Sequence, residues 1–201
     1  MTETILKLRQ IGELVLRQPA RPLSLDEIQS PETQRLIAAM RDTLRDAPGV
    51  GLAAPQVGYG IQLAIIEDRA EYQQAIPPEQ LAERGRQPLP FQVIINPKLN
   101  IIDPAQNLFF EGCLSVAGFT ALVPRAARVR VEGLDENGEP LTIEAEDWHA
   151  RILQHEIDHL HGRLYLDSML PRSFMTSANH ARFWKDVPVC EVCSAFQISY
   201  T

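Results

Sequence analysis

The stretch QHEIDHLHG, residues 154–162, constrains the fold more than any other part of the chain. Side chains four residues apart share one face of an α-helix, so His155 and His159 can direct both imidazoles at one ion. Glu156 lies beside them and can reach a metal-bound water. This H-E-x-x-H pattern predicts a metal-binding helix in which the metal lowers the pKa of water and the glutamate takes its proton. The alternative is a helix with two incidental histidines.

A site of this type needs a third protein ligand. One protease pattern supplies a further histidine downstream, but this chain has Tyr165 at that position. His161 follows His159 by two residues and points about 200° away around the helix, so we expect it in solvent. Cys113, in the segment FFEGCLSVAGF, is the other candidate. Its thiolate would complete a Cys-His-His site with a fourth position open for water, whereas the alternative is a buried, inert cysteine.

Hydrophobic periodicity predicts a helix over residues 24–47, with Ser30 as a cap and Pro31 after it. We expect Pro48 to end this helix, followed by a glycine-punctuated loop over residues 49–60. Four apolar side chains of the helix share one face: Leu36, Ile37, Met40 and Leu44.

Two apolar runs, residues 61–67 and 91–96, predict strands, the second of which is expected to stop at Pro97. The polar, proline-rich segment between them, residues 71–90, is expected to form a surface excursion with one short helix.

From residue 122 the pattern changes to period two, and Asn137-Gly138 predicts a hairpin whose second strand covers residues 141–146. Asp147 is then expected to cap the metal-binding helix, which runs from about residue 148 to 161 and ends at Gly162. These elements predict an α+β fold with small antiparallel or mixed β-sheets surrounding a central metal-binding helix.

Three segments together resemble the signature motifs of peptide deformylases, in the same order: GVGLAAPQVG at 49–58, EGCLSV at 111–116 and QHEIDHL at 154–160. The resemblance covers roughly residues 5–170, and SVAGF is more similar to the subtype of organelles and some bacteria. It implies a hydrolase that removes the formyl group from the N-terminal formyl-methionine of new polypeptides.

The resemblance also implies residue roles. Cys113, His155 and His159 would be the metal ligands, and Glu156 would be the general base and then the proton donor to the leaving amine. One divalent ion is implied, with Fe(II) favoured and Zn(II), Ni(II) or Co(II) as replacements, all of which suit one sulfur and two nitrogen ligands.

In the same way, the Gln56 side chain and the Leu114 backbone N–H would form the oxyanion hole. Glu111 and Gln154 flank the ligands in sequence, and either could hold a ligand or the cysteine loop in place. Arg151 is expected to meet Glu111 or to border the methionine pocket, with an incidental surface ion pair as the alternative. The residues expected to bind substrate are Val50, Gly51, Leu52, Gly112, Trp148 and Arg151.

Three positions depart from the family pattern. Leu14 and Ala117 stand where proline is common, and Asp147 stands where glycine usually precedes the metal-binding helix. None of them is an expected ligand, so the departures bear on substrate preference rather than on activity.

We expect a catalytic domain over residues 1–170 and a C-terminal tail over residues 171–201, packed on the same domain or at a dimer interface. The tail carries Cys190-x-x-Cys193, which could bind zinc or do redox chemistry. Two cysteines packed in a C-terminal strand are the more ordinary interpretation. The tail shows no basic amphipathic run, so the sequence does not support ribosome association.

The net charge of −7 disfavours direct binding to nucleic acid, whose affinity would come from neutralised phosphates. The N-terminal residues lack a long apolar run, so we expect a cytoplasmic protein without a membrane span, either a monomer or a homodimer. Formyl-methionyl nascent peptides are the expected partners. The competing functions are an H-E-x-x-H metallopeptidase and a zinc-stabilised binding module, whose metal would need four protein ligands.

Overall fold

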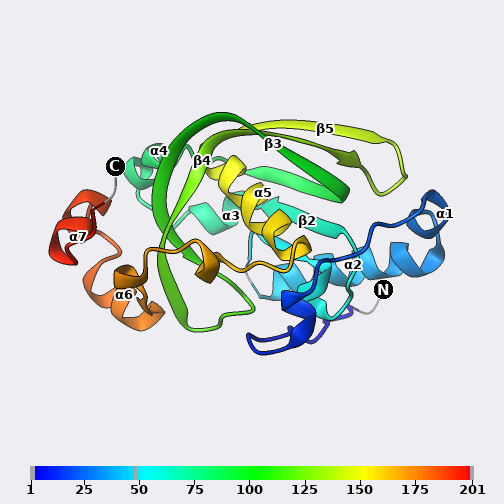
Figure 1. The fold of residues 1–201 in the computed structure, drawn as a ribbon, viewed down its shortest axis with the longest axis horizontal. Coiled ribbons are helices and arrows are strands. Elements are labelled where there is room, and N and C mark those ends of the chain that lie inside the picture. The colour runs from blue at the N-terminus through cyan, green and yellow to red at the C-terminus, as the bar shows by residue number, and fades with distance from the viewer. Residues whose placement is uncertain (1–2, 48, 200–201) are drawn as a thin grey trace.

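The structure is a computed structural model that describes residues 3–47 and 49–199. Its described residues form one six-stranded antiparallel sheet in the order β1-β2-β3-β4-β5, with β6 paired to β4. Figure 1 shows the long strands β3 and β4 curving round α5, the helix at the centre of the molecule. The strands are β1 (Gly51–Ala53), β2 (Leu63–Asp68), β3 (Leu89–Gly112), β4 (Phe119–Leu134), β5 (Pro140–Glu146) and β6 (Met175–Thr176). The predicted α+β fold with strands around a central helix is confirmed.

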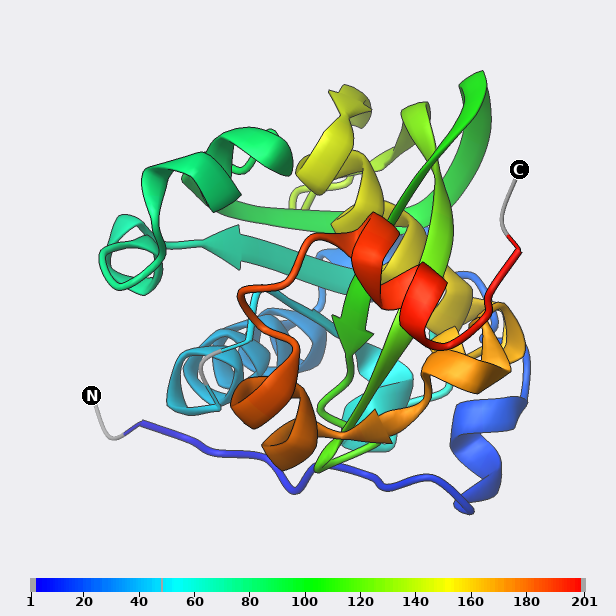
Figure 2. The ribbon, with the colours of Figure 1, turned by 90° about the vertical axis from the view of Figure 1, so that its left-hand side faces the viewer.

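The helices lie on both sides of this sheet and at its ends (Figures 1 and 2). The α-helices are α1 (Leu25–Ile28), α2 (Pro31–Asp46), α3 (Ala70–Gln73), α4 (Pro78–Glu83), α5 (Asp147–Leu160), α6 (Ser177–Phe183) and α7 (Val189–Ala195). Single 3₁₀ turns are η1 (Leu14–Arg17), η2 (Ala54–Val57), η3 (Tyr165–Asp167) and η4 (Pro171–Ser173). Within residues 3–47 and 49–199, no helix is both long and apolar enough to cross a membrane.

The predicted helix over residues 24–47 is two helices, α1 and α2, separated at Ser30. The Ser30 hydroxyl accepts a hydrogen bond from the Thr33 N–H, and Pro31 occupies the first turn of α2. The expected stop at Pro48 lies outside the described residues. The predicted loop over residues 49–60 contains β1 and η2, so it is more ordered than its glycines indicate.

The centre of the sheet is buried on both faces, because α2 covers one face and α5 the other. Leu63 and Ile65 of β2 pack in the hydrophobic cluster that contains the apolar side chains of α2, which we call the α2 cluster. Ile66 packs in the cluster that contains those of α5, the α5 cluster. Successive residues of a strand point to opposite faces, so a strand covered twice is apolar throughout. This explains the continuous apolar runs of β2 and the start of β3.

Pro97 does not end the second strand, so that prediction is wrong. β3 continues to Gly112, and its pairing with β4 shifts between Ile95 and Lys98 and again between Asp103 and Gln106. Proline is tolerated at such irregularities because the ladder there needs no donor. With these shifts of register, β3 pairs with β2 at its start and with β4 along the rest of its length, up to Gly112.

The predicted hairpin at Asn137-Gly138 is confirmed, with Gly138 at φ +85° between β4 and β5. The expected end of α5 at Gly162 is also confirmed, because Gly162 has φ +72° and an added Cβ would lie 2.7 Å from the Arg17 carbonyl oxygen. Asp147 does not cap α5. It has φ +50°, and its carboxylate accepts from the Asn107 amide instead (2.9 Å).

The C-terminal tail folds back over the outer side of β3 and β4 (Figure 2). Val192 of α7 packs with Phe110 and Leu122, and Trp184 lies against Phe196 at 4.9 Å between ring centroids. Cys190 and Cys193 therefore lie in helix α7 and not in a C-terminal strand, which corrects that expectation.

Candidate metal centre

Helix α5 and the loop after β3 bring Cys113, His155 and His159 together. One ligand atom from each lies within 4.8 Å of the others, and Cys113 Sγ is 3.4 Å from His159 Nε2. The two imidazole rings are 5.0 Å apart and nearly perpendicular, at 81°. One thiolate and two imidazoles converging in this way fit a divalent transition metal with a position left for a further ligand.

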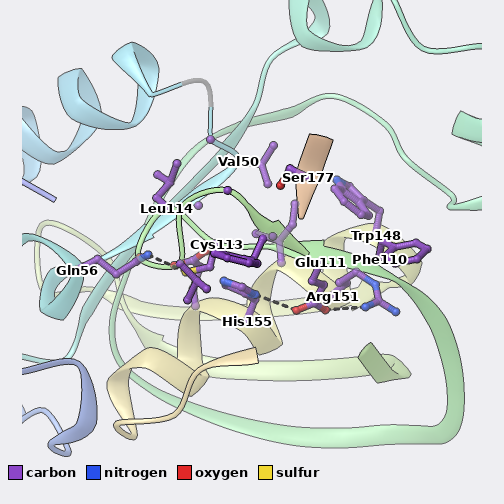
Figure 3. Close-up of a pocket in the computed structure, with 18 of the residues that line it drawn as sticks. Val50, Gln56, Phe110, Glu111, Cys113, Leu114, Trp148, Arg151, His155 and Ser177 are labelled. Atoms are coloured by element: carbon purple, nitrogen blue, oxygen red, sulfur yellow. Dashed lines mark hydrogen bonds and ion pairs between the residues drawn. The ribbon is translucent and has the colours of Figure 1, made fainter. Parts of the chain in front are cut away.

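Two hydrogen-bond donors contact the Cys113 sulfur. The Ser115 N–H and the Gln56 Nε2 both lie 3.4 Å from Sγ. The Val116 N–H donates to the Cys113 carbonyl (3.0 Å) and closes a turn directly after β3. The turn therefore aims the sulfur at α5, and donors hold it there (Figure 3).

A buried carboxylate orients His155. The His155 Nδ1 is 2.9 Å from Glu111 Oε2, so the Nε2 atom of that ring is the nitrogen available to an ion. Glu111 also accepts two hydrogen bonds from Arg125 (3.0 Å each) and one from Arg151 (2.6 Å). Burial alone would raise the pKa of Glu111, but Arg125 and the His155 hydrogen bond outweigh it and hold that pKa well below its ordinary value.

These charges are interior, so Arg151 is not an incidental surface ion pair. Arg151 is 3% exposed and Glu111 6%. Arg125 also pairs with Asp158, at 2.5 Å, so the network ties both ends of α5 to β3 and β4. Gln154 extends this attachment through two hydrogen bonds to the Ala126 backbone.

Burial also lowers the pKa of one of the two α5 histidines at the site. It holds the pKa of His159 well below its ordinary value, so the ring is neutral, which is the form that ligates a metal. Tyr165, where one protease pattern has histidine, packs its ring against His155 at 6.3 Å and 19°. His161 is exposed, as expected.

Glu156 lines a cavity that Cys113 and His155 also line, and it is 4% exposed. Burial raises its pKa from 4.5 to about 7. Its Oε2 has no hydrogen-bond partner among the described residues. A buried carboxylate oxygen without a partner, in a cavity that Cys113 and His155 also line, is well placed to exchange a proton with a water molecule.

Gln56 lies in η2 with its side chain almost completely buried. Its Oε1 accepts from the Ala53 N–H (2.8 Å), which turns Nε2 toward Cys113 and Ser115. Leu114 follows the cysteine, and its carbonyl accepts from the Gln10 side chain (3.0 Å). The two residues expected to supply an oxyanion hole therefore flank Cys113.

The cavity in front of these groups has a volume of about 380 Å³. Five of the six expected substrate-binding residues line it: Val50, Gly51, Gly112, Trp148 and Arg151. Leu52 does not, because its side chain is fully buried in the α2 cluster. The indole N–H of Trp148 donates a hydrogen bond to Asp68 (3.1 Å), and the Arg86 guanidinium carbon lies 4.8 Å from the centroid of the indole ring. These two contacts fix the position of the Trp148 side chain.

Several other lining residues were not predicted as substrate-binding, among them Phe110, Phe119 and Ser177. Phe110 and Phe119 flank the EGCLSV motif and could have been found as its neighbours. Ser177 is distant in sequence and carries no motif. Cys190 is exposed and Cys193 packs beside Phe110, so neither belongs to the ligand group found within residues 3–47 and 49–199.

Comparisons with known proteins agree with this geometry. Residues 5–174 match the sequence model of the family described as Polypeptide deformylase. The chain is 46% identical over 182 residues to Peptide deformylase 1A, chloroplastic, of Solanum lycopersicum, covering 90% of this chain and 64% of that protein. It is 46% identical over 173 residues to Peptide deformylase 3 of Streptomyces avermitilis, covering 86% of this chain and 75% of that one.

A solved structure is also similar. The Met-Ala-Ser-bound class I type b peptide deformylase from Acinetobacter baumannii has a TM-score of 0.73 and 31% identity, covering 84% of this chain and 100% of that one. The chain thus spans just under two thirds of the length of the Solanum lycopersicum protein, at 64%, and all of the A. baumannii chain.

Proposed function

The chain belongs to the peptide deformylase family, and we propose that it removes the formyl group from the N-terminal formyl-methionine of newly synthesised polypeptides. The convergence of Cys113, His155 and His159 beside the buried Glu156 carries this proposal. The similarity to a structure described as Met-Ala-Ser-bound supports a peptide that begins with methionine as the product.

We propose that Cys113, His155 and His159 hold one divalent ion. Such an ion lowers the pKa of a water molecule and polarises the formyl carbonyl. Glu156 would take the proton of the attacking water and pass it to the leaving amine, since a pKa of about 7 suits a group that must both accept and release a proton near neutrality.

The oxyanion that develops on the formyl carbonyl needs donors aimed at it. Gln56 Nε2 faces the Cys113 sulfur, and the Leu114 N–H is the next backbone donor after the ligand. We assign these two groups to the oxyanion hole, where loss of one donor commonly raises the barrier by about 3 kcal/mol.

The substrate would bind along β1, which lies at the end of the sheet. Gly51 and Val50 line the cavity there, and a strand with one unpaired edge can hydrogen-bond an extended peptide. The methionine side chain would enter the cavity between Gly112, Trp148 and Arg151. The side chain of Leu52 would act only as support behind this edge.

The donor set supports several metals, and we propose Fe(II) as the working ion, with Zn(II), Ni(II) or Co(II) as substitutes. The family resemblance favours iron. Activity that decays in air and is restored by anaerobic Fe(II) is the expected result. Equal turnover by the zinc-loaded protein would remove the reason to prefer iron.

We also propose a domain organisation, an oligomeric state and a location. Residues 1–170 would be the catalytic domain and 171–201 a tail packed on it, in a monomer or homodimer. The cytoplasm is the proposed location, although the Solanum lycopersicum relative is named chloroplastic. Sedimentation and localisation of a tagged chain would test these points.

A metallopeptidase is the competing enzyme class. A third ligand downstream is its expected feature, and Tyr165 occupies that position with its ring against His155. Formate release and cleavage of casein, measured on one preparation, would distinguish the two activities.

The principal experiment measures formate release from formyl-Met-Ala-Ser by anaerobically prepared Fe(II) protein. Glu156→Ala is expected to lower kcat by about 10²–10⁴-fold, the usual contribution of a general base. Glu32→Ala, an exposed glutamate on α2, is the matched control and should leave kcat unchanged. Absence of formate from metal-loaded wild-type protein would reject deformylation, and full activity of Glu156→Ala would reject the assignment of the base.

A further inference from the structure

A second cavity lies between α4, the end of β3 and the C-terminal tail. Its volume is about 380 Å³, which falls in the range of about 300–1,000 Å³ that is usual for small-molecule sites. Phe109 and Phe110 of β3 line it, and the His180 ring of α6 lies 4.4 Å from the Phe110 ring. The Gln80 side chain donates to Asp186 (3.2 Å) and so joins α4 to the tail. Because these contacts already exist, the cavity needs no rearrangement to form.

Arg84 brings an uncompensated positive charge to this second cavity. Its guanidinium carbon lies 5.5 Å from the Phe109 ring centroid and 5.8 Å from that of Trp148. Its Nε atom is buried and has no hydrogen-bond partner among the described residues. Arg86, by contrast, donates two hydrogen bonds to Asp68, at 2.8 and 3.0 Å. A half-buried guanidinium without a carboxylate is costly, and an anionic ligand would satisfy it.

The same cavity also presents carboxylates. Glu79 and Glu83 are four residues apart in α4 and therefore share one face of that helix. Neither takes part in a salt bridge within the part of the chain that the structure describes. Lys185 and Asp186, which also line the cavity, already pair with each other at 3.8 Å. The cavity thus combines an unpaired cation with two carboxylates that have no salt-bridge partner.

Aromatic rings line the rest of the cavity. Trp184 lines it together with Phe109 and Phe110, and the Trp184 ring packs on Phe196. Burial, and after it the charge of Arg84, lowers the pKa of His180, so this ring is neutral at neutral pH. Aromatic side chains prefer to pack with other aromatic rings. A ligand complementary to all of these groups carries a carboxylate, an ammonium and an aromatic ring.

We propose that the second cavity binds a free α-amino acid with an aromatic side chain. Its carboxylate would pair with Arg84, its ammonium with Glu79 or Glu83, and its ring would pack against Phe110 and Trp184. The proposal is independent of the deformylase function. The match to the family model ends at residue 174, so the tail residues of this site lie beyond it.

The second cavity also adjoins the catalytic one. Phe110 lines both cavities, and Trp148, which packs on Arg84, lines the catalytic cavity. Figure 3 shows Phe110 and Trp148 at the same end of the catalytic cavity. A test of the second cavity must therefore show that the ligand does not simply occupy the first.

The experiment is isothermal titration calorimetry of the metal-loaded protein with L-phenylalanine, in the absence and presence of excess Met-Ala-Ser. Saturable binding is expected, and Met-Ala-Ser should not compete with it. Three analogues each lack one group: hydrocinnamate the ammonium, phenethylamine the carboxylate and L-alanine the ring. Each should bind at least about tenfold more weakly than L-phenylalanine, because a charged hydrogen bond or an aromatic contact is lost.

Arg84→Met tests the site from the protein side. It should weaken L-phenylalanine at least about tenfold but leave phenethylamine unchanged, because that analogue has no carboxylate for Arg84. Arg182→Met is the matched control, since Arg182 also lies over a phenylalanine ring, that of Phe183 at 4.8 Å, and does not line the cavity. It should keep the wild-type affinity.

A second variant uses exposed residues and decides the question if Arg84→Met does not fold. Glu79→Gln combined with Glu83→Gln should weaken L-phenylalanine about tenfold and should not weaken hydrocinnamate, which has no ammonium.

Four results would overturn the proposal: no saturable binding of L-phenylalanine, displacement by Met-Ala-Ser, equal affinity for the analogues, or unchanged affinity in both the Arg84 and the glutamate variants. Formate release is not an input to this test. A protein that binds L-phenylalanine as expected but releases no formate would reject the proposed function alone.

Discussion

Gly51→Ala tests whether the position of Glu156 determines the rate. Gly51 is in β1, directly against the Glu156 side chain. A Cβ at residue 51 would lie 2.3 Å from Glu156 Oε1, 2.6 Å from Cδ and 2.7 Å from Cγ. Ordinary contacts begin at 3.4 Å, so the carboxylate would have to retreat by about 1 Å.

A displacement of this size matters more for the rate than for folding. A group misplaced by about 1 Å can lower a rate by about 10²-fold, which corresponds to about 2.7 kcal/mol of barrier. The carboxylate is the part of Glu156 nearest the new methyl, and a side-chain end can move at lower energetic cost than backbone. We therefore expect kcat to fall about 10²-fold while the protein remains folded and retains its metal.

The assay is a double-mutant cycle on formate release. Gly51→Ala should reduce kcat in the wild-type background and have almost no further effect in Glu156→Ala, because the group that it displaces is then absent. Gly60→Ala is the control, since an added Cβ there meets nothing within 4 Å. Equal losses from Gly51→Ala in both backgrounds would refute the reasoning, as they would show that the methyl acts on the substrate instead.

Three further outcomes follow from the structure. Glu111→Gln should lower the free energy of unfolding by about 3–5 kcal/mol in urea titrations, because arginines stay buried without their counter-charge, and metal affinity should fall about 10–100-fold as His155 loses its orienting carboxylate. Asp147→Ala should be about 1 kcal/mol less stable than Asp147→Gly, because residue 147 has φ +50°. The Arg45 hydrogen bond lowers the pKa of Glu67 below 4.5, so its stabilisation is present above pH 4.5 and is lost as the pH falls further; Glu67→Gln should flatten that part of the stability curve in urea midpoints measured between pH 6 and 3.

The sequence predicted the metal-binding helix well because its signal is local. Spacing alone puts His155 and His159 on one face, and Gly162 marks the end of the helix. The hairpin at Asn137-Gly138 is of the same kind, since a turn residue with positive φ must be supplied where the chain reverses. Such features depend on neighbours within a few residues.

The errors arose where tertiary contacts override local rules. Pro97 could not stop β3, because the pairing with β4 shifts at that point and needs no donor from the proline. Asp147 has a residue type that caps helices, but its positive φ and its bond to Asn107 direct the carboxylate elsewhere. Ser177 reaches the cavity only through the pairing of β6 with β4, which no periodicity encodes.

The proximity of Gly51 and Glu156 joins the packing of the fold to its chemistry. Burial is the main reason that the pKa of Glu156 is raised to about 7, and the bare backbone of Gly51 is part of what buries it. A larger residue in β1 would push the carboxylate away, whereas a gap there would admit water and lower the pKa. Gly51 would thus have two roles in the proposed reaction, because its bare backbone leaves room for a peptide at the edge of β1 and also packs closely against the Glu156 side chain.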